Sequence, residues 1–285
     1  MRVKRYDSTQ TFRDAVWEVL LENEVQNNLP IGFIKNERGL DTSDWLMAAV
    51  LDDDGGVLLT AACTPPFNLV LYETRNQPAD GAVRLLADAL LSDGIQLPGV
   101  LAEQGLAHRF AQSYVGEDRS RRHMSMRIMR LDRVAGLPLS PGRIRPIRED
   151  DLYFAPYWAH AFAEECKVEQ FGLHTHVERL RARVGKDTHY IWEDGIPVSQ
   201  AVHGRSTEHG AVVNAVYTPP FYRGKGYATS AVAALSRMLL ERGNHFCCLF
   251  ADAENPISCG IYRKIGYVDQ CTYDELRFIQ EEATN

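Results

Sequence analysis

The sequence lacks the features that mark membrane-spanning and secreted chains. No apolar run approaches the ~18 residues that a membrane span needs, and no apolar core follows Met1–Asp7, so we expect no signal peptide. Six cysteines in 285 residues, five of them in the second half, do not form a disulfide framework. We expect small buried thiols in a reducing cytoplasm, and therefore a cytoplasmic protein without a membrane partner.

A basic surplus is also missing. The chain has 31 Lys and Arg against 38 Asp and Glu, a formal net charge of −7. Residues 1–140 hold 15 basic and 19 acidic residues, and residues 141–285 hold 16 and 19. A nucleic-acid binder needs a concentration of positive charge, so we expect no nucleic-acid partner. A cationic small molecule or a peptide remains open as the substrate.

The length points to two domains. At about 150 residues per domain, 285 residues suggest two of them. The Pro- and Gly-rich segment Val134–Gly142 lies near the midpoint and is typical of a linker. We therefore predict one domain over residues 1–135 and a second over residues 143–285.

The second half alternates strand and helix patterns. We expect helices over 148–163, 176–184, 227–241 and 256–265, and strands over 143–147, 189–192, 198–204, 211–217, 245–251, 267–268 and 275–279. Early hairpins followed by a late strand–helix–strand crossover indicate an α/β domain with a mixed sheet flanked by helices.

The first half repeats this pattern at a shift of 149 residues. Residues 81–94 lie over residues 230–243 with six of fourteen positions identical, and both segments end in glycine. Residues 97–103 fall on 246–252, again apolar with an acidic residue last. Two amphipathic helices can resemble each other by chance. The preserved order of strand, turn, helix and strand nevertheless favours a duplicated fold.

The most informative segment is the loop between a strand and a helix at residues 216–228. Two glycines, Gly224 and Gly226, let the backbone approach a ligand, and the first N–H groups of the following helix suit an anion such as a pyrophosphate. A Walker loop is excluded because Gly226 follows Lys225, and a dinucleotide fingerprint because Thr229 occupies its third small position. An ordinary glycine-containing turn is the alternative.

Two ordered motifs resemble those of the GCN5-related N-acetyltransferases (GNAT). The run Arg223–Ala228 (RGKGYA) resembles the family's Arg/Gln-x-x-Gly-x-Gly/Ala signature. Asn255–Tyr267, with an Asn, a small-residue helix, a Tyr and an aromatic after Gly, resembles its second motif. The resemblance covers about residues 143–280. It implies acetyl-CoA as the donor, an amine as the acceptor, and tandem GNAT folds with mostly antiparallel sheets.

The resemblance also implies roles for single residues. Pantetheine would lie along the strand ending at Thr218, and Pro219 and Pro220 would end that ladder because proline has no N–H group. Tyr262 is implied as the general acid for the leaving thiolate; the alternative is an amphipathic core tyrosine. The implied acetyl-CoA-binding residues are Val216, Tyr217, Thr218, Arg223, Gly224, Lys225, Gly226, Tyr227, Ala228 and Asn255.

The general base is left open by the sequence. The candidates are Glu164, Glu165, Glu169, Asp252 and His203. Glu165 and Glu169 lie near the family's acceptor-binding helices, and we take Glu165 as the catalytic candidate, although paired glutamates are often a solvated helix face.

Neither a metal site nor a serine nucleophile is indicated. His174 and His176 have no further ligands at matching spacing, so we expect no metal. No Gly-x-Ser-x-Gly nucleophile elbow is present.

The first half lacks the loop motif. At the 149-residue shift Thr74–Ala79 replaces Arg223–Ala228, without glycine and with Pro78. With a small gap, Arg109 stands opposite Tyr262. We therefore expect a degenerate GNAT-like domain that does not bind acetyl-CoA and that closes the acceptor cleft, stabilises the second domain or mediates association. We expect a monomer or a homodimer. A non-catalytic acyl-CoA-binding or sensing protein is the alternative to an N-acetyltransferase.

Overall fold

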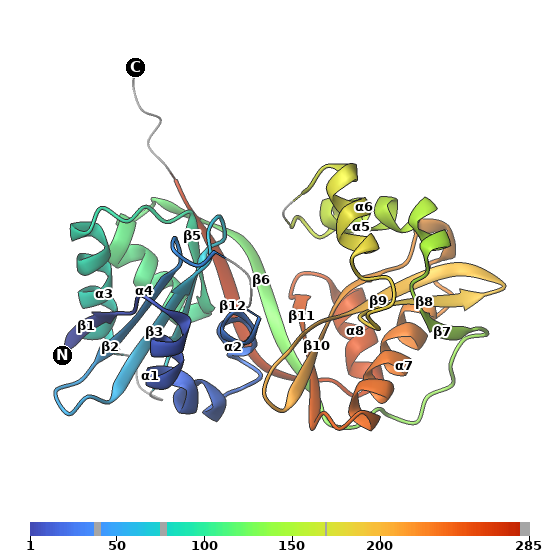
Figure 1. The fold of residues 1–285 in the computed structure, drawn as a ribbon, viewed down its shortest axis with the longest axis horizontal. Coiled ribbons are helices and arrows are strands. Elements are labelled where there is room, and N and C mark those ends of the chain that lie inside the picture. The colour runs from blue at the N-terminus through green and yellow to red at the C-terminus, as the bar shows by residue number, and fades with distance from the viewer. Residues whose placement is uncertain (37–40, 75–78, 169, 280–285) are drawn as a thin grey trace, which may run out of the picture. The chain divides into compact units, whose positions relative to one another are not determined.

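The chain divides into two compact units in a computed structural model, which describes residues 1–36, 41–74, 79–168 and 170–279. One unit is Met1–Ile128 together with the C-terminal segment from Gln270, and the other is Met129–Asp269. The sequence led us to place the whole of 143–285 in the second domain. The strand β12 (Val268–Phe278) accounts for the difference, because it pairs antiparallel with β5 (Gly99–Glu103) of the first unit. In Figure 1, red β12 runs beside blue-green β5.

The first unit has a mixed sheet in the order β1-β2-β3-β4-β5-β12-β6. From β1 to β5 the pair β4–β5 is parallel and the other neighbouring strands are antiparallel. Its other strands are β1 (Arg2–Arg5), β2 (Leu46–Leu51), β3 (Val57–Cys63), β4 (Leu69–Glu73) and β6 (Ser120–Leu131), the last ending in the second unit. Its helices are α1 (Thr9–Glu22), α2 (Asn28–Lys35), α3 (Asp80–Ser92) and α4 (Gln104–Val115).

Alternation along the strands assigns the helices to opposite faces of this sheet. Leu46, Ala48 and Val50 of β2 share a core with α3 and α4. Met47 and Ala49, which point the other way, share a core with α1 and α2. The whole of β2 is buried for this reason, with helices on both faces.

The second unit repeats this architecture in the order β6-β11-β10-β9-β8-β7. Its strands are β7 (Arg143–Pro146), β8 (His189–Asp194), β9 (Ile196–Ser206), β10 (Gly210–Tyr217) and β11 (Phe246–Asp252). Its helices are η1 (Glu149–Tyr153), α5 (Ala155–Glu165), α6 (Leu173–Arg181), η2 (Pro220–Tyr222), α7 (Tyr227–Glu241) and α8 (Pro256–Ile265). The β10–β11 pair is parallel, and the pairs β9–β10, β8–β9 and β7–β8 are antiparallel. The predicted fold class is confirmed.

The predicted repeat is visible in the cores. Ala82, Val83 and Leu86 of α3 are buried, and so are the residues 149 positions later on α7, Ala231, Val232 and Leu235. Both helices are followed by a glycine with positive φ, Gly94 and Gly243. Equivalent positions of α3 and α7 are therefore buried, so the two helices pack with the same face.

Two element predictions were wrong. The expected helix over 148–163 is broken between η1 and α5 at Phe154, whose φ of −127° is not helical. Asp151 is held there by a buried ion pair with Arg145 at 2.6 Å, and Pro156 favours a new first turn. The two short strands expected over 267–268 and 275–279 are one strand, β12. Several polar residues of this segment have a low strand propensity, but pairing of Tyr273–Arg277 with β5 makes the segment extended.

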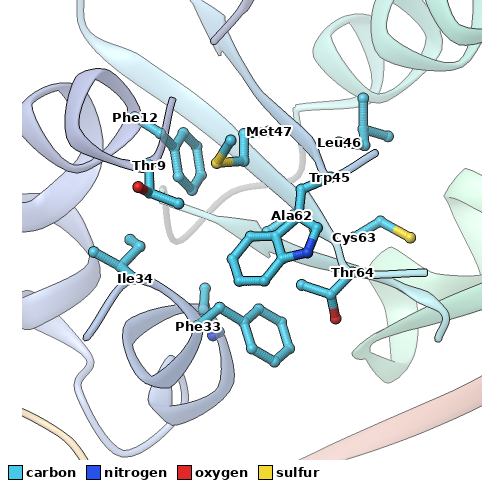
Figure 2. Close-up of a pocket in the computed structure, with 11 residues that line it drawn as sticks. Thr9, Phe12, Phe33, Ile34, Trp45, Leu46, Met47, Ala62, Cys63 and Thr64 are labelled. Carbon is cyan, nitrogen blue, oxygen red and sulfur yellow. The ribbon is translucent and has the colours of Figure 1, made fainter. Parts of the chain in front are cut away.

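A small apolar pocket lies in the first unit (Figure 2). Phe33 of α2 and Trp45 meet edge-on at 6.3 Å beside it. Its volume of about 10 Å³ leaves space for about one water molecule, and apolar walls do not hold water. The pocket is therefore a packing gap between α1, α2 and the sheet.

Among the described residues, no helix is long and apolar enough to cross a membrane.

Burial of His189 makes the second unit sensitive to acid. His189 of β8 is 2% exposed and its Nε2 lies 3.2 Å from Oε1 of Gln200. Burial, with the positive charge of Arg183, lowers the pKa of His189 to about 4. In the unfolded chain His189 binds a proton near pH 6.5, whereas in the folded chain it does so only near pH 4. The free energy of unfolding therefore decreases as the pH falls between these values. The loss amounts to about 3 kcal/mol.

We expect His189→Gln to remove this part of the pH dependence. The free energy of unfolding, measured by urea titration at pH 7 and pH 4.5, should fall less in the variant than in the wild type. His174→Gln, at an exposed histidine, is the control, and its free energy of unfolding should fall between pH 7 and pH 4.5 as much as that of the wild type. An equal acid-induced loss in His189→Gln would show that His189 does not cause it.

Candidate functional site

The candidate site begins where two parallel strands stop pairing. The register of β10 and β11 covers Gly210 to Val212 against Phe246 to Cys248, although β10 continues to Tyr217 and β11 to Asp252. On its other edge β10 carries a bulge against β9 between Asn214 and Tyr217, where Ala215 adopts a φ of +46°. The last residues of β10 therefore lie outside the parallel ladder and are available to an extended ligand.

The loop after β10 forms a cradle at the start of α7. Gly224 and Gly226 have φ values of +76° and +78°, and Gly226 is the N-cap residue of α7. Residues 223–226 are exposed. The unpaired N–H groups of the first turn and the helix dipole make this position suitable for an anion.

Ser140 supports the cradle, and the sequence did not indicate it. Its Oγ donates to the carbonyl of Lys225 at 2.7 Å, and its N–H donates to Oγ of Ser230 at 2.8 Å. A Cβ atom on Gly226 would lie 2.8 Å from Ser140 Oγ. Ser140 comes from the segment expected to be a linker, so only the tertiary structure brings it to a loop 85 residues away.

Tyr262 of α8 lies in the hydrophobic core of the second unit. It is 9% exposed and its ring meets that of Tyr267 edge-on at 6.0 Å. Burial, reinforced by the nearby Cys166 and Cys259, raises the pKa of the Tyr262 hydroxyl. The hydroxyl is therefore protonated at neutral pH, as a proton donor must be.

Arg223 joins the cradle to the end of α5. Its Nη2 contacts both carboxylate oxygens of Glu165, at 2.8 and 2.7 Å, and its Nε donates to the carbonyl of Thr218 at 2.8 Å. The hydroxyl of Tyr217 donates to Glu165 Oε1 at 3.4 Å. The structure thus brings Glu165, Tyr217, Thr218 and Arg223 together.

The other implied cofactor residues have local roles as well. Asn255 caps α8, its Oδ1 accepting from the N–H of Ser258 at 3.1 Å. Thr218 Oγ1 lies 2.8 Å from Ser199 Oγ, and the Tyr227 hydroxyl donates to Asp194 at 2.7 Å. Val216 and Ala228 are half-buried on either side of the cradle, and Lys225 is exposed within it.

The other described base candidates have hydrogen-bond or ion-pair partners of their own. Glu164 lies 3.8 Å from His160 on the same helix, and His203 lies 3.1 Å from Ser206. Burial lowers the pKa of His203. Asp252 accepts the N–H of Glu254 at 2.9 Å. Glu169 is outside the described residues. Where the structure is described, no group of three or more His, Cys, Asp or Glu side chains is arranged to hold a metal.

In the first unit, carboxylates already occupy the corresponding helix start. Glu73 accepts from the N–H of Ala79, the N-cap of α3, at 2.6 Å. Arg109 binds Glu73 at 2.6 Å and Asp80, in the first turn of α3, at 3.0 Å. Of the loop compared with the cradle, residues 75–78 are outside the described part of the chain.

The tyrosine of α8 also has no hydroxyl counterpart on α4. Tyr262 stands seven residues after its N-cap, Asn255, and the residue seven positions after Glu103, the N-cap of α4, is Phe110. The cap positions therefore pair Tyr262 with Phe110, one residue beyond the Arg109 of the gapped sequence comparison.

Known proteins share this fold over the whole chain. A GCN5-related N-acetyltransferase from Sphaerobacter thermophilus matches with a TM-score of 0.68 and 15% identity, covering 98% of this chain and 96% of that one. A tandem GNAT protein of the clavulanic acid biosynthesis pathway matches with a TM-score of 0.60 and 12% identity, covering 99% of each chain. A GNAT-family acetyltransferase from Colwellia psychrerythraea gives a TM-score of 0.61, 10% identity, and coverage of 99% and 100%.

Sequence comparison adds a match that begins in the second unit and ends within β12. Residues 194–276 match the family model described as FR47-like protein. No curated protein matches the chain significantly. The fold and site define a tandem α/β protein with a glycine loop at the start of α7 in its second unit. The chain has the tandem fold of the GCN5-related N-acetyltransferases, which confirms the resemblance in the motifs.

Proposed function

We propose that the protein is an N-acetyltransferase that moves an acetyl group from acetyl-CoA to an amine of a small molecule or peptide, and that residues 143–280 perform the reaction. The observation that carries this proposal is the glycine cradle at the N-terminus of α7. It follows β10, whose last residues are not paired with β11. The FR47-like match over residues 194–276 supports it.

The residues present suit acetyl-CoA. Backbone N–H groups from Gly224 to Ala228 would bind the pyrophosphate, with Lys225 adding positive charge. The end of β10 would hold pantetheine by backbone hydrogen bonds, and a strand N–H near Tyr217 would polarise the thioester carbonyl. Asn255, whose Oδ1 caps α8, would donate from Nδ2.

The chain's own groups would move two protons. Glu165, directly or through water, would accept a proton from the amine as its nitrogen forms a bond to the thioester carbon. The tetrahedral oxyanion then collapses, the carbon–sulfur bond breaks, and Tyr262 gives its proton to the sulfur. The products are the acetylated amine and CoA. Glu165 then releases the amine proton to solvent, and Tyr262 recovers a proton from solvent.

Release of free thiol from acetyl-CoA across a panel of amines tests the proposal. We expect release that depends on an acceptor. Tight acetyl-CoA binding with no release for any acceptor would favour the alternative, an acyl-CoA-binding or sensing protein. The ion pair between Arg223 and Glu165 favours this alternative, because in this pair the candidate base is bound to Arg223.

We also expect one acetyl-CoA per chain. Glu73 and Asp80 place negative charge at the start of α3, where a pyrophosphate would have to bind in the first unit. Isothermal titration calorimetry should therefore give a stoichiometry of one, and Gly226→Ala should weaken that single site. A second equivalent that survives in Gly226→Ala would place acetyl-CoA in the first unit and contradict its degeneracy.

A further inference from the structure

Arg223 has two structural partners in different elements. Through Nη2 it contacts Glu165, the last residue of α5, and through Nε it contacts the carbonyl of Thr218, just after β10. Its guanidinium also lies 5.6 Å from the centre of the Tyr217 ring. Arg223 therefore ties the cradle loop to the helix that carries the candidate base.

The ion pair is accessible from solvent. The side chains of Arg223 and Glu165 are 46% and 45% exposed. An exposed pair is weak, and an incoming anion can reach the guanidinium without disrupting the core. Gly224, Lys225 and Gly226 follow Arg223 directly in the chain, so the arginine borders the proposed pyrophosphate position.

We propose that Glu165 and the pyrophosphate of acetyl-CoA compete for Arg223, so that binding of acetyl-CoA releases the Glu165 carboxylate toward the acceptor amine. The inference rests on the proposed function. A pyrophosphate carries more negative charge than one carboxylate, and a guanidinium binds phosphate through paired N–H groups, so the exchange favours the pyrophosphate. The bond to Thr218 keeps Arg223 at the loop while its Nη2 changes partner.

This exchange would couple the two substrates. Glu165 accepts the amine proton only after Arg223 has turned to the pyrophosphate, so acetyl-CoA prepares the site for the acceptor. The Glu165 carboxylate in turn lowers the affinity for acetyl-CoA, because two groups that compete for Arg223 weaken each other's binding by the same factor. Removing the negative charge of Glu165 should therefore strengthen the binding of acetyl-CoA even though it removes the candidate base.

The test is a double-mutant cycle with two ligands, measured by calorimetry. Glu165→Gln should tighten acetyl-CoA about two- to fivefold, the range for an exposed ion pair, and leave S-acetylpantetheine, which has no pyrophosphate, unchanged. Arg223→Gln should weaken acetyl-CoA, and adding Glu165→Gln to Arg223→Gln should then have no effect. Glu164→Gln makes the same charge change next to Glu165, where the partner is His160, and should alter neither affinity.

Three results would overturn the proposal. These are weaker or unchanged acetyl-CoA binding by Glu165→Gln, an equal gain for S-acetylpantetheine, and an equal gain in Glu164→Gln, which would indicate long-range charge alone. Thermal unfolding confirms that each variant is folded. If the wild-type protein does not bind acetyl-CoA at all, the proposed function itself fails, and this outcome is distinct from a wild type that binds with no response to Glu165.

Discussion

Tyr262→Phe should lower kcat about 10²- to 10⁴-fold, the usual contribution of general acid catalysis, with little change in the Kd for acetyl-CoA. Phenylalanine keeps the ring in its place against Tyr267 and removes only the hydroxyl. Without a proton donor the thiolate leaves as an anion in a buried site, which raises the barrier. Initial rates of thiol release at saturating acetyl-CoA and acceptor measure the effect.

Tyr267→Phe is the matched control for this experiment. The Tyr267 hydroxyl is hydrogen-bonded to Ser236 Oγ at 2.8 Å inside the core. Its removal should cost about 1 kcal/mol of stability and leave kcat close to that of the wild type. A kcat in Tyr262→Phe equal to that of the wild type, or a loss in Tyr267→Phe of the same size, would remove Tyr262 from the mechanism.

Gly226→Ala should weaken acetyl-CoA binding about tenfold or more, which corresponds to about 1.4 kcal/mol. An alanine at φ +78° is strained by about 1–2 kcal/mol, and its Cβ would lie 2.8 Å from Ser140 Oγ. The loop must shift to relieve both effects, and the N–H groups of the cradle shift with it. The Kd for acetyl-CoA from calorimetry reports this loss.

Two other glycines separate the causes. Gly224→Ala has the same kind of φ but no neighbour within 4 Å, so it should show the backbone strain without the collision. Gly260→Ala lies in α8 with open space around its Cβ and should keep the wild-type affinity. If Gly226→Ala binds acetyl-CoA as Gly260→Ala does, the cradle is not the pyrophosphate site.

Elements with strong local signals were predicted closely. The bounds expected for α7 and α8, residues 227–241 and 256–265, are those of the structure. A glycine with positive φ precedes α7 and another follows α8, and Asn255 caps α8 with its own side chain. These signals involve residues close together in the chain, so the sequence alone carries them.

Elements that depend on distant partners were missed or misjudged. The sequence predicted two short strands in place of β12, because β12 pairs with β5, about 170 positions earlier in the chain. The break at Phe154 depends on Arg145 holding Asp151 from β7. Local propensity contains neither contact, and tertiary pairing overrides it.

The candidate site divides in the same way. The two glycines and the helix start follow from the order of residues, because a strand, a turn and a helix succeed one another there. Tyr262 follows from the second motif, which covers α8. The support from Ser140 and the ion pair between Glu165 and Arg223 join residues 85 and 58 positions apart. By itself the sequence determined the tandem fold and the loop that suits an anion. Only the tertiary structure decided which side chains meet there, because those contacts are made by folding and not by neighbours in the chain.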